Sequence, residues 1–139
     1  KITNVKTYIN HSNSIFYVDE DFSCVDCKCY LYEGNDIYIG KDNQWSFDIQ
    51  IRNSDSHSII DMTNNKICNK GQDVSIGNHC WLANNVAVLK GGVLGNDTIV
   101  GAYSVVTKHF RENNVIVAGN PARLVKGNVK WSRHLLSDI

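Results

Sequence analysis

A histidine that follows an aspartate by two residues is the first candidate for chemistry in this sequence. Histidine has an ordinary pKa of about 6.5, so His57 could accept a proton at neutral pH and return it later in a reaction. In an extended strand Asp55 and His57 would point to one face, where the carboxylate could orient the imidazole ring or bind hydroxyl groups. An equally open interpretation is that Asp55 is a turn residue bonded to its own backbone, beside an ordinary surface histidine.

The five cysteines raise the question of a metal site. Cys24, Cys27 and Cys29 form a CxxCxC pattern, but Cys68 and Cys80 are isolated and no second cluster follows. A structural zinc site usually needs four such ligands, so we expect no bound metal. We interpret Cys27 and Cys29 as small packing residues on one face of a strand.

A row of aliphatic residues spaced six apart must form the framework that positions these side chains. The row is Ile76, Leu82, Val88, Leu94, Val100 and Val106, preceded at two residues by Val74, Cys80, Val86, Gly92, Thr98 and Ser104. A period of six fits neither a helix, with about 3.6 residues per turn, nor a simple strand, with a period of about two. It indicates a chain that turns a corner every six residues. Three short strands then make one triangular coil, and the aliphatic residues stack inside.

The same spacing extends backward in weaker form and then breaks. It runs through Ile39, Trp45, Ile51 and His57, preceded by Ile37, Asn43, Ile49 and Asp55. The phase slips across residues 58–73, which are rich in the turn formers Asn, Asp and Gly. We therefore predict a loop at 58–73 that leaves the stack. Loops on rigid repeat scaffolds commonly carry function.

Small polar residues and glycine mark the predicted corners. Gly40, Gly77, Gly95 and Gly101 each follow a member of the row, and Asn35, Asp36, Asn84, Asn85, Asn96 and Asp97 serve corners as well. Glycine permits positive φ or close backbone approach, and Asn and Asp tolerate the left-handed region. His79 also falls at a corner, where we expect a solvated side chain.

At 139 residues the chain has the size of one domain. We expect an all-β fold with an N-terminal coil or cap over 1–36, hexapeptide coils over 37–107, and a C-terminal cap over 108–139. In the first part, Val25, Cys27, Cys29 and Leu31 alternate with polar residues, as in a half-buried strand. In the last part we predict a strand at 115–118, a turn at 119–121 and a short helix at 129–136.

Composition excludes several classes of function. Lys and Arg number 14, equal to Asp and Glu, so no basic surface for nucleic acid is expected. No apolar run approaches the ~20 residues of a membrane span, and no signal peptide opens the chain. An odd number of cysteines without a signal peptide fits a reducing environment, so we expect a cytoplasmic location. Because the chain starts at Lys1 rather than Met, we expect a fragment or a processed protein.

Three motifs resemble the hexapeptide-repeat acyltransferases. The runs 76–82, 100–108 and 118–123 read Ile-Gly-Asn-His-Cys-Trp-Leu, Val-Gly-Ala-Tyr-Ser-Val-Val-Thr-Lys and Ala-Gly-Asn-Pro-Ala-Arg. The resemblance covers roughly residues 37–126 and is closest to the maltose and galactoside O-acetyltransferases and their capsule and lipopolysaccharide relatives. It implies a left-handed parallel β-helix, acetyl-CoA as co-substrate, and a homotrimer with active sites between subunits. Threefold packing also suits flat-sided prisms.

The resemblance further implies roles for individual residues. The spacing from His57 to Trp81 looks like that between the family's catalytic histidine and an active-site tryptophan. His57 would then take the proton from a sugar hydroxyl as it attacks the thioester and return it to the CoA thiolate, with Asp55 beside it. Cofactor contacts would come from Trp81, Asn84, Ala102, Thr107, Lys108, Arg123 and Lys126, the last two on phosphates. Acceptor contacts would come from Asp26, Asn35 and Tyr38.

The activity that the resemblance implies is O-acetylation of a carbohydrate. The segment 53–58 looks more like the capsule, lipopolysaccharide and sialic-acid branch than the maltose enzyme, and this likeness bears on the acceptor. The acceptor would be a surface-polysaccharide sugar or its nucleotide-linked precursor. An N-acetyltransferase of an amino-sugar nucleotide remains an alternative, as does a non-catalytic assembly module. A γ-class carbonic anhydrase shares the coil, but His57 and His79 lack a third histidine at a plausible spacing for zinc.

Overall fold

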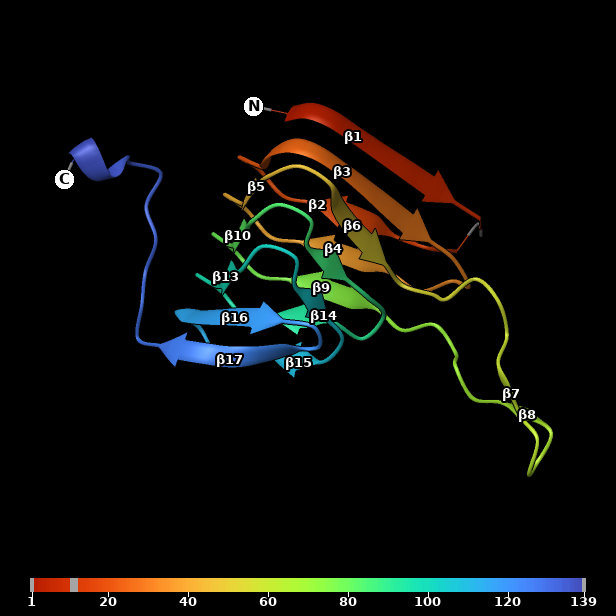
Figure 1. The fold of residues 1–139 in the computed structure, drawn as a ribbon. Helices are drawn as coiled ribbons and strands as arrows, with labels where there is room; N and C mark the ends of the chain where they lie inside the picture. Colours follow the sequence, from red (N-terminus) through yellow and green to blue (C-terminus); the bar gives the residue numbers. More distant parts are fainter. Residues whose placement is uncertain (1, 11–12, 139) are drawn as a thin grey trace.

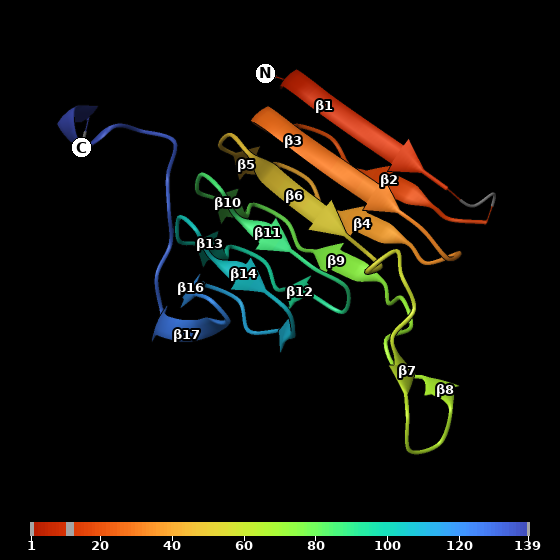
Figure 2. The same cartoon turned by 45° about the vertical axis from the view of Figure 1, so that its right-hand side comes forward.

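The computed structural model describes residues 2–10 and 13–138; Lys1, His11, Ser12 and Ile139 lie outside the described residues. Short strands and turns wind into a stack of three-sided coils, from which one loop projects (Figure 1 and Figure 2). The predicted all-β fold is confirmed. No helix in the described ranges is long and apolar enough to cross a membrane.

Three rows of parallel strands form the sides of the prism. The first side contains β5 (Gln44–Trp45), β10 (Trp81–Leu82), β13 (Ile99–Val100) and β16 (Val115–Gly119), followed by the antiparallel β17 (Ala122–Gly127). The second side contains β6 (Ile49–Arg52), β11 (Ala87–Val88) and β14 (Val105–Val106). The third side contains β2 (Phe16–Val18), β4 (Ile37–Ile39), β9 (Val74–Ile76), β12 (Val93–Leu94) and β15 (His109–Phe110).

Two long strands complete the stack at its N-terminal end. β1 (Ile2–Ile9) pairs in parallel with β3 (Ser23–Leu31). β3 pairs with β5 through its first residues and with β6 through its later ones. This strand therefore crosses the edge between the first and second sides, which explains why those two sides form one sheet while the third is separate.

The row spaced by six residues forms the core, as predicted. Every member from Ile76 to Val106 is at most 2% exposed, and the residues two positions earlier are also buried. The backward extension is buried from Ile37 to Ile51 at its row positions and ends there, because Asp55 and His57 are exposed. Burial of each such aliphatic side chain contributes roughly 1.5–3 kcal/mol, so the stack is the main source of stability.

The corners contain both left-handed backbone and closely approaching coils, as expected. The left-handed conformation occurs at non-glycine residues, and glycine allows the close approach. Asp42, His79 and Asp97 have φ of 58°, 52° and 54° and follow one another along the edge between the third and first sides. Gly77 serves close approach instead: a Cβ there would lie 2.7 Å from the carbonyl carbon of Gly95 in the next coil. Any side chain at this position would push two coils apart.

The cysteines pack as predicted, but the alternation around them is wrong at one end. Cys27 and Cys29 are buried on one face of β3, whereas Val25 is 49% exposed and Cys24 is buried in its place. The backbone N–H groups of Val25 and Asp26 both donate to the carbonyl oxygen of Ser46. The corner falls at this point, so the inward face shifts by one residue.

The last residues form an extended arm rather than the predicted helix at 129–136. Only a 3₁₀ turn, η1 (Leu136–Asp138), is helical. We call residues 128–138 the C-terminal arm; it runs back along the first side of the prism (Figure 1). Trp131 is buried and donates its indole N–H to the carbonyl oxygen of His79, and Arg133 pairs with Asp42. These anchors outweigh the weak intrinsic stability of an eight-residue helix.

The arm also overturns the prediction that His79 is solvated. The imidazole is half-buried, stacks on the Trp131 indole at 4.2 Å between ring centroids, and has Nδ1 2.8 Å from Asp97 Oδ1. His79 therefore belongs to the contact that holds the arm.

The predicted loop at 58–73 leaves the stack as a hairpin (Figure 2). Its tip contains β7 (Ile60–Asp61) and β8 (Lys66–Ile67), which pair antiparallel. Beneath it the prism continues, because β4 and β9 pair directly although they are far apart in sequence.

Candidate active site

The base of the projecting loop holds the segment that carries Asp55 and His57. Asp55 contacts the Lys90 ammonium and accepts a hydrogen bond from Asn69 Nδ2 at 2.9 Å. The same Asn69 amide donates to the carbonyl oxygen of His57 at 2.8 Å, and Lys90 donates to the carbonyl oxygen of Asn69 at 3.0 Å. These contacts join the two ends of the loop.

The expectation that Asp55 and His57 share one face of an extended strand is wrong. Ser56 between them has φ of 69°, in the left-handed region, so the alternation of an extended chain is interrupted. The Asp55 carboxylate binds Lys90 and Asn69, rather than its own backbone or the imidazole. Its direct effect is to fix the loop base that carries His57.

The electrostatics of Asp55 follow from these contacts. The hydrogen bond from Lys90 holds the pKa of the Asp55 carboxyl below its usual range. Desolvation partly opposes this shift, and the hydrogen bond from Asn69 adds a smaller lowering. The pKa of Asp55 is lower in the folded state than in the unfolded state. The ionised carboxylate therefore stabilises the folded state above the ordinary carboxyl pKa, and this stabilisation is lost as pH falls through the lowered pKa.

Replacement of Asp55 by asparagine is expected to loosen the loop base without unfolding the prism. Asparagine keeps the side-chain size but loses the charge that attracts Lys90. Hydrogen exchange of backbone amides in residues 58–73 should accelerate, while amides of β9 to β14 keep their protection. In the wild-type protein the protection factors of the same amides, which correct for the slower intrinsic exchange at low pH, should fall when pH falls through the lowered Asp55 pKa. Unchanged exchange in the variant at neutral pH would contradict this role.

His57 itself is held through its backbone, and its ring is exposed. Within the described ranges the imidazole makes no hydrogen bond to another side chain or backbone group. A histidine held in this way leaves the unprotonated nitrogen of its neutral ring free to accept a proton, as a general base requires.

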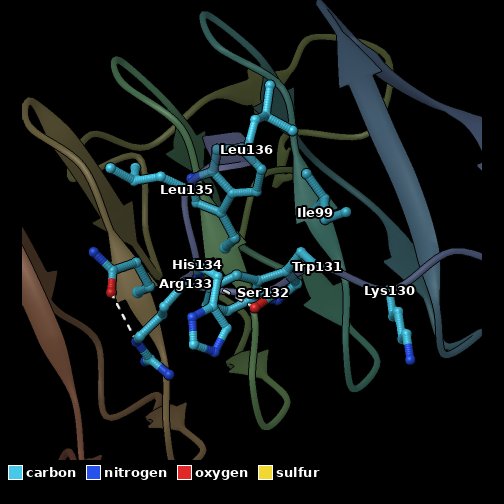
Figure 3. A pocket seen from close by; sticks show the side chains of 10 residues that line it. Ile99, Lys130, Trp131, Ser132, Arg133, His134, Leu135 and Leu136 are labelled. Atoms are coloured by element: carbon cyan, nitrogen blue, oxygen red, sulfur yellow. Dashed lines mark hydrogen bonds between the residues drawn. The ribbon is translucent and has the colours of Figure 1, made fainter. Parts of the chain in front are cut away.

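Trp81 lies on another side of the prism. It opens β10 on the first side and is 41% exposed. It lines a cavity of about 780 Å³ together with Ile99 and the arm residues Trp131, Leu135 and Leu136. Figure 3 shows the arm side chains and Ile99 around this space. His57 lies instead beyond the end of β6 on the second side, so one chain does not bring His57 and Trp81 together.

The predicted cofactor residues are exposed or half-buried and are distributed over two edges and the C-terminal hairpin. Asn84 and Ala102 occupy successive coils at the edge between the first and second sides, where the Tyr103 N–H donates to the Asn84 carbonyl. Thr107 and Lys108 lie exposed between β14 and β15, at the next edge. The remaining two, Arg123 and Lys126, are exposed on β17.

The three predicted acceptor residues are not gathered in one place. Asp26 lies where β3 crosses an edge and accepts a hydrogen bond from Asn4. Tyr38 lies on the third side, where its hydroxyl donates to Asp36 at 3.0 Å, and this bond raises the Tyr38 pKa. Asn35 lies nearest the loop base, because its carbonyl oxygen accepts from Asn53 Nδ2.

Sequence reasoning missed three polar residues near the loop base. Lys90 and Asn69 make the contacts described above, and Arg52 at the end of β6 donates to Ser56 at 3.4 Å. No motif marks them, since their proximity depends on where the loop rejoins the stack. In the part of the chain that the structure describes, no group of three or more His, Cys, Asp and Glu side chains could hold a metal ion. The isolated Cys80 is buried, and burial raises the pKa of its thiol to about 12.

The fold and its six-residue repeat define a class of protein, the parallel β-helices built from hexapeptides. No protein-family model matches the chain. It is 38% identical over 105 residues to a polysialic acid O-acetyltransferase from Neisseria meningitidis, covering 76% of this chain and 49% of that protein. The chain thus spans about half the length of this curated relative.

Solved structures agree with this relationship. The structure of the polysialic acid O-acetyltransferase OatWY superposes with a TM-score of 0.90 at 34% identity, covering 98% of this chain and 65% of that one. A galactoside acetyltransferase in complex with coenzyme A shares the fold, with a TM-score of 0.60 at 17% identity over 91% of this chain and 65% of the other. The chain belongs to the hexapeptide-repeat acyltransferase family, whose coils are left-handed.

Proposed function

We propose that the chain is part of an enzyme that transfers an acetyl group from acetyl-CoA to a hydroxyl group of a carbohydrate. A sugar of a surface polysaccharide, or its precursor, is the acceptor. The observation that carries the proposal is the loop base, where Asn69 fixes the main chain of His57 while the exposed ring is available to a ligand. The similarity to polysialic acid O-acetyltransferases supports the reaction and the class of acceptor.

His57 acts as the general base in this mechanism. Its ring takes the proton of the sugar hydroxyl while the oxygen attacks the thioester carbonyl carbon. The carbon–sulfur bond then breaks, and the imidazolium protonates the CoA thiolate. No acyl-enzyme is needed, because the chemistry requires only that the base and both substrates be held together. Asp55 supports this step as a positioning residue that fixes the loop base through Lys90 and Asn69.

The active site is completed by a second copy of the chain. His57 and Trp81 belong to different sides of one prism, so a site containing both needs two subunits. We propose a homotrimer in which the pantetheine arm follows the edge that carries Asn84 and Ala102. Thr107 and Lys108 bind near the nucleotide, and Arg123 and Lys126 bind the phosphates. These exposed cations suit phosphate by charge and donor geometry.

The residues that we propose to bind the acceptor sugar are spread over several surfaces. Asn35 adjoins the loop base, and Asp26 and Tyr38 offer oxygen acceptors on neighbouring surfaces. The predicted cytoplasmic location, where acetyl-CoA would be supplied, stays a prediction.

The test is release of CoA thiol from acetyl-CoA across a panel of acceptors. Sialic acid oligomers and neutral sugars with free hydroxyls are compared with an amino-sugar nucleotide. We expect acceptor-dependent thiol release with a hydroxyl sugar and an ester-linked acetyl group in the product. Transfer only to the amino sugar would instead support N-acetylation, and no thiol release with any acceptor would support an assembly module.

A further inference from the structure

Arg52 is a cation to which the protein supplies few partners, and it lies five residues before His57. Within the described ranges no carboxylate forms an ion pair with it. Its only side-chain hydrogen bond there is a long one of 3.4 Å, from Nη2 to Ser56 Oγ, and the buried Nε has no partner. A guanidinium has five N–H donors, so most of its capacity is unused by the described residues.

Three neighbouring strands hold this guanidinium in place. β1, β3 and β6 run side by side (Figure 2), and Tyr8, Tyr30 and Arg52 occupy the same register across them. The Tyr8 and Tyr30 rings stack with centroids 4.8 Å apart, and the Arg52 guanidinium carbon lies 4.4 Å from the Tyr30 ring centre. Stacking on an aromatic face fixes the plane of a guanidinium without consuming its N–H donors.

A groove of about 310 Å³ lies beside this stack and reaches the loop base. It is lined by Gln50, Arg52, Ser54, Asp55, Leu89 and Lys90. The Lys90 and Asp55 charges are already paired with each other. The Arg52 charge also acts on the Asp55 carboxylate without forming an ion pair with it. Two cations and one carboxylate line the groove, so its net charge is positive and favours an anionic ligand.

We propose that Arg52 binds the carboxylate of an acidic sugar in the acceptor, and so makes the enzyme specific for anionic polysaccharides. This inference rests on the proposed O-acetyltransferase function. A planar guanidinium matches a carboxylate with two parallel hydrogen bonds. Because Arg52 contacts Ser56, a sugar held there would extend its hydroxyl groups along residues 53–57, towards His57. The carboxylate contact would thus set which hydroxyl meets the base.

The test compares sialic acid oligomers with the same oligomers after reduction of their carboxyl groups to alcohols. Arg52→Gln is expected to raise KM for the charged oligomer by about 10- to 100-fold, the worth of a charge-assisted pair, with little change in KM for acetyl-CoA. Arg52→Lys keeps the charge but loses the planar fork, so an intermediate KM is expected. On the reduced oligomer, wild type and Arg52→Gln should have equal KM. Arg111→Gln, an exposed arginine on the turn after β15, is the matched control.

Two kinetic results would overturn the proposal. The first is an equal KM penalty for Arg52→Gln on charged and reduced oligomers, which would indicate a structural role. The second is a penalty confined to acetyl-CoA, which would place a CoA phosphate on Arg52. Activity of the variant on the reduced oligomer shows that it folds.

A binding titration separates this inference from the proposed function. If the wild type acetylates no acceptor, titration of the protein with both oligomers still tests Arg52 without turnover. Tighter binding of the charged oligomer, lost in Arg52→Gln, would support the carboxylate site. Equal binding of both oligomers would overturn it.

Discussion

Replacement of His57 by alanine is expected to lower the rate of acetyl transfer by roughly 10²–10⁴-fold. The change removes the only group proposed to accept the hydroxyl proton. It leaves the core intact, because His57 is exposed and its contact to Asn69 uses the backbone carbonyl. Initial rates of CoA thiol release at saturating acetyl-CoA measure the effect, and the unfolding transition should be unchanged. KM for acetyl-CoA should change little, since the lost interaction acts in the chemical step.

The matched control is His109→Ala, which removes an exposed imidazole from β15, away from the loop base. Its rate should remain close to wild type. An active His57→Ala enzyme, or equal losses in both variants, would contradict the assignment of the base.

The same variant tests whether sites are shared between copies. Trp81→Ala should also be impaired, because the indole belongs to the other half of the proposed site. When the His57→Ala and Trp81→Ala proteins are mixed and reassembled, some interfaces regain both residues. Partial recovery of thiol release is therefore expected, and no recovery in verified mixed trimers would contradict a shared site.

Replacement of Trp45 by alanine is expected to lower the free energy of unfolding by about 3–5 kcal/mol. Trp45 has no exposed surface and meets Phe22 edge to face, with centroids 4.8 Å apart. Its indole N–H donates to Asn43 Oδ1, and the Asn43 amide donates to the carbonyl oxygens of Gly40 and Gly77 in two successive coils. Alanine would leave a cavity inside the stack, and Asn43 Oδ1 would lose its hydrogen-bond donor.

Denaturant unfolding at fixed protein concentration measures this loss. Tyr17→Ala provides the comparison, because it removes an aromatic ring that is 49% exposed; we expect less than about 1 kcal/mol there. Trp45→Phe should fall between the two, since it retains most of the volume but not the N–H donor. A loss below about 1 kcal/mol for Trp45→Ala would contradict the role of this ring in the core.

The sequence predicts the stack well because each of its rules is local and repeated. A residue such as Leu82 is buried for the same reason as Val88 and Leu94, so one period identifies the whole row. Corner residues such as Asn85 and Asp97 also follow a local rule, and both have positive φ. At Val25 a corner falls inside the continuous strand β3. There the alternation predicts an inward-facing Val25, whereas Val25 is exposed and Cys24 is buried.

The sequence predicts the site less well because its contacts join distant segments. Asp55 meets Lys90 only because the chain returns to the stack at β9 after the loop. The spacing between Asp55 and His57 gave no sign that Ser56 would break the extended conformation. The conformation of the C-terminal arm also depends on distant contacts, since Trp131 and Arg133 bind partners about 50 and 90 residues earlier in the chain.

The pairing of β4 with β9 beneath the loop has a consequence for how such proteins diversify. The two strands meet in register, Ile37 with Val74 and Ile39 with Ile76, as though the residues between β6 and β9 were spliced in. The hairpin tip can therefore lengthen, shorten or change sequence at little cost to the supporting prism. Related sequences can therefore differ in this one insert while the strands that support it keep their pairing.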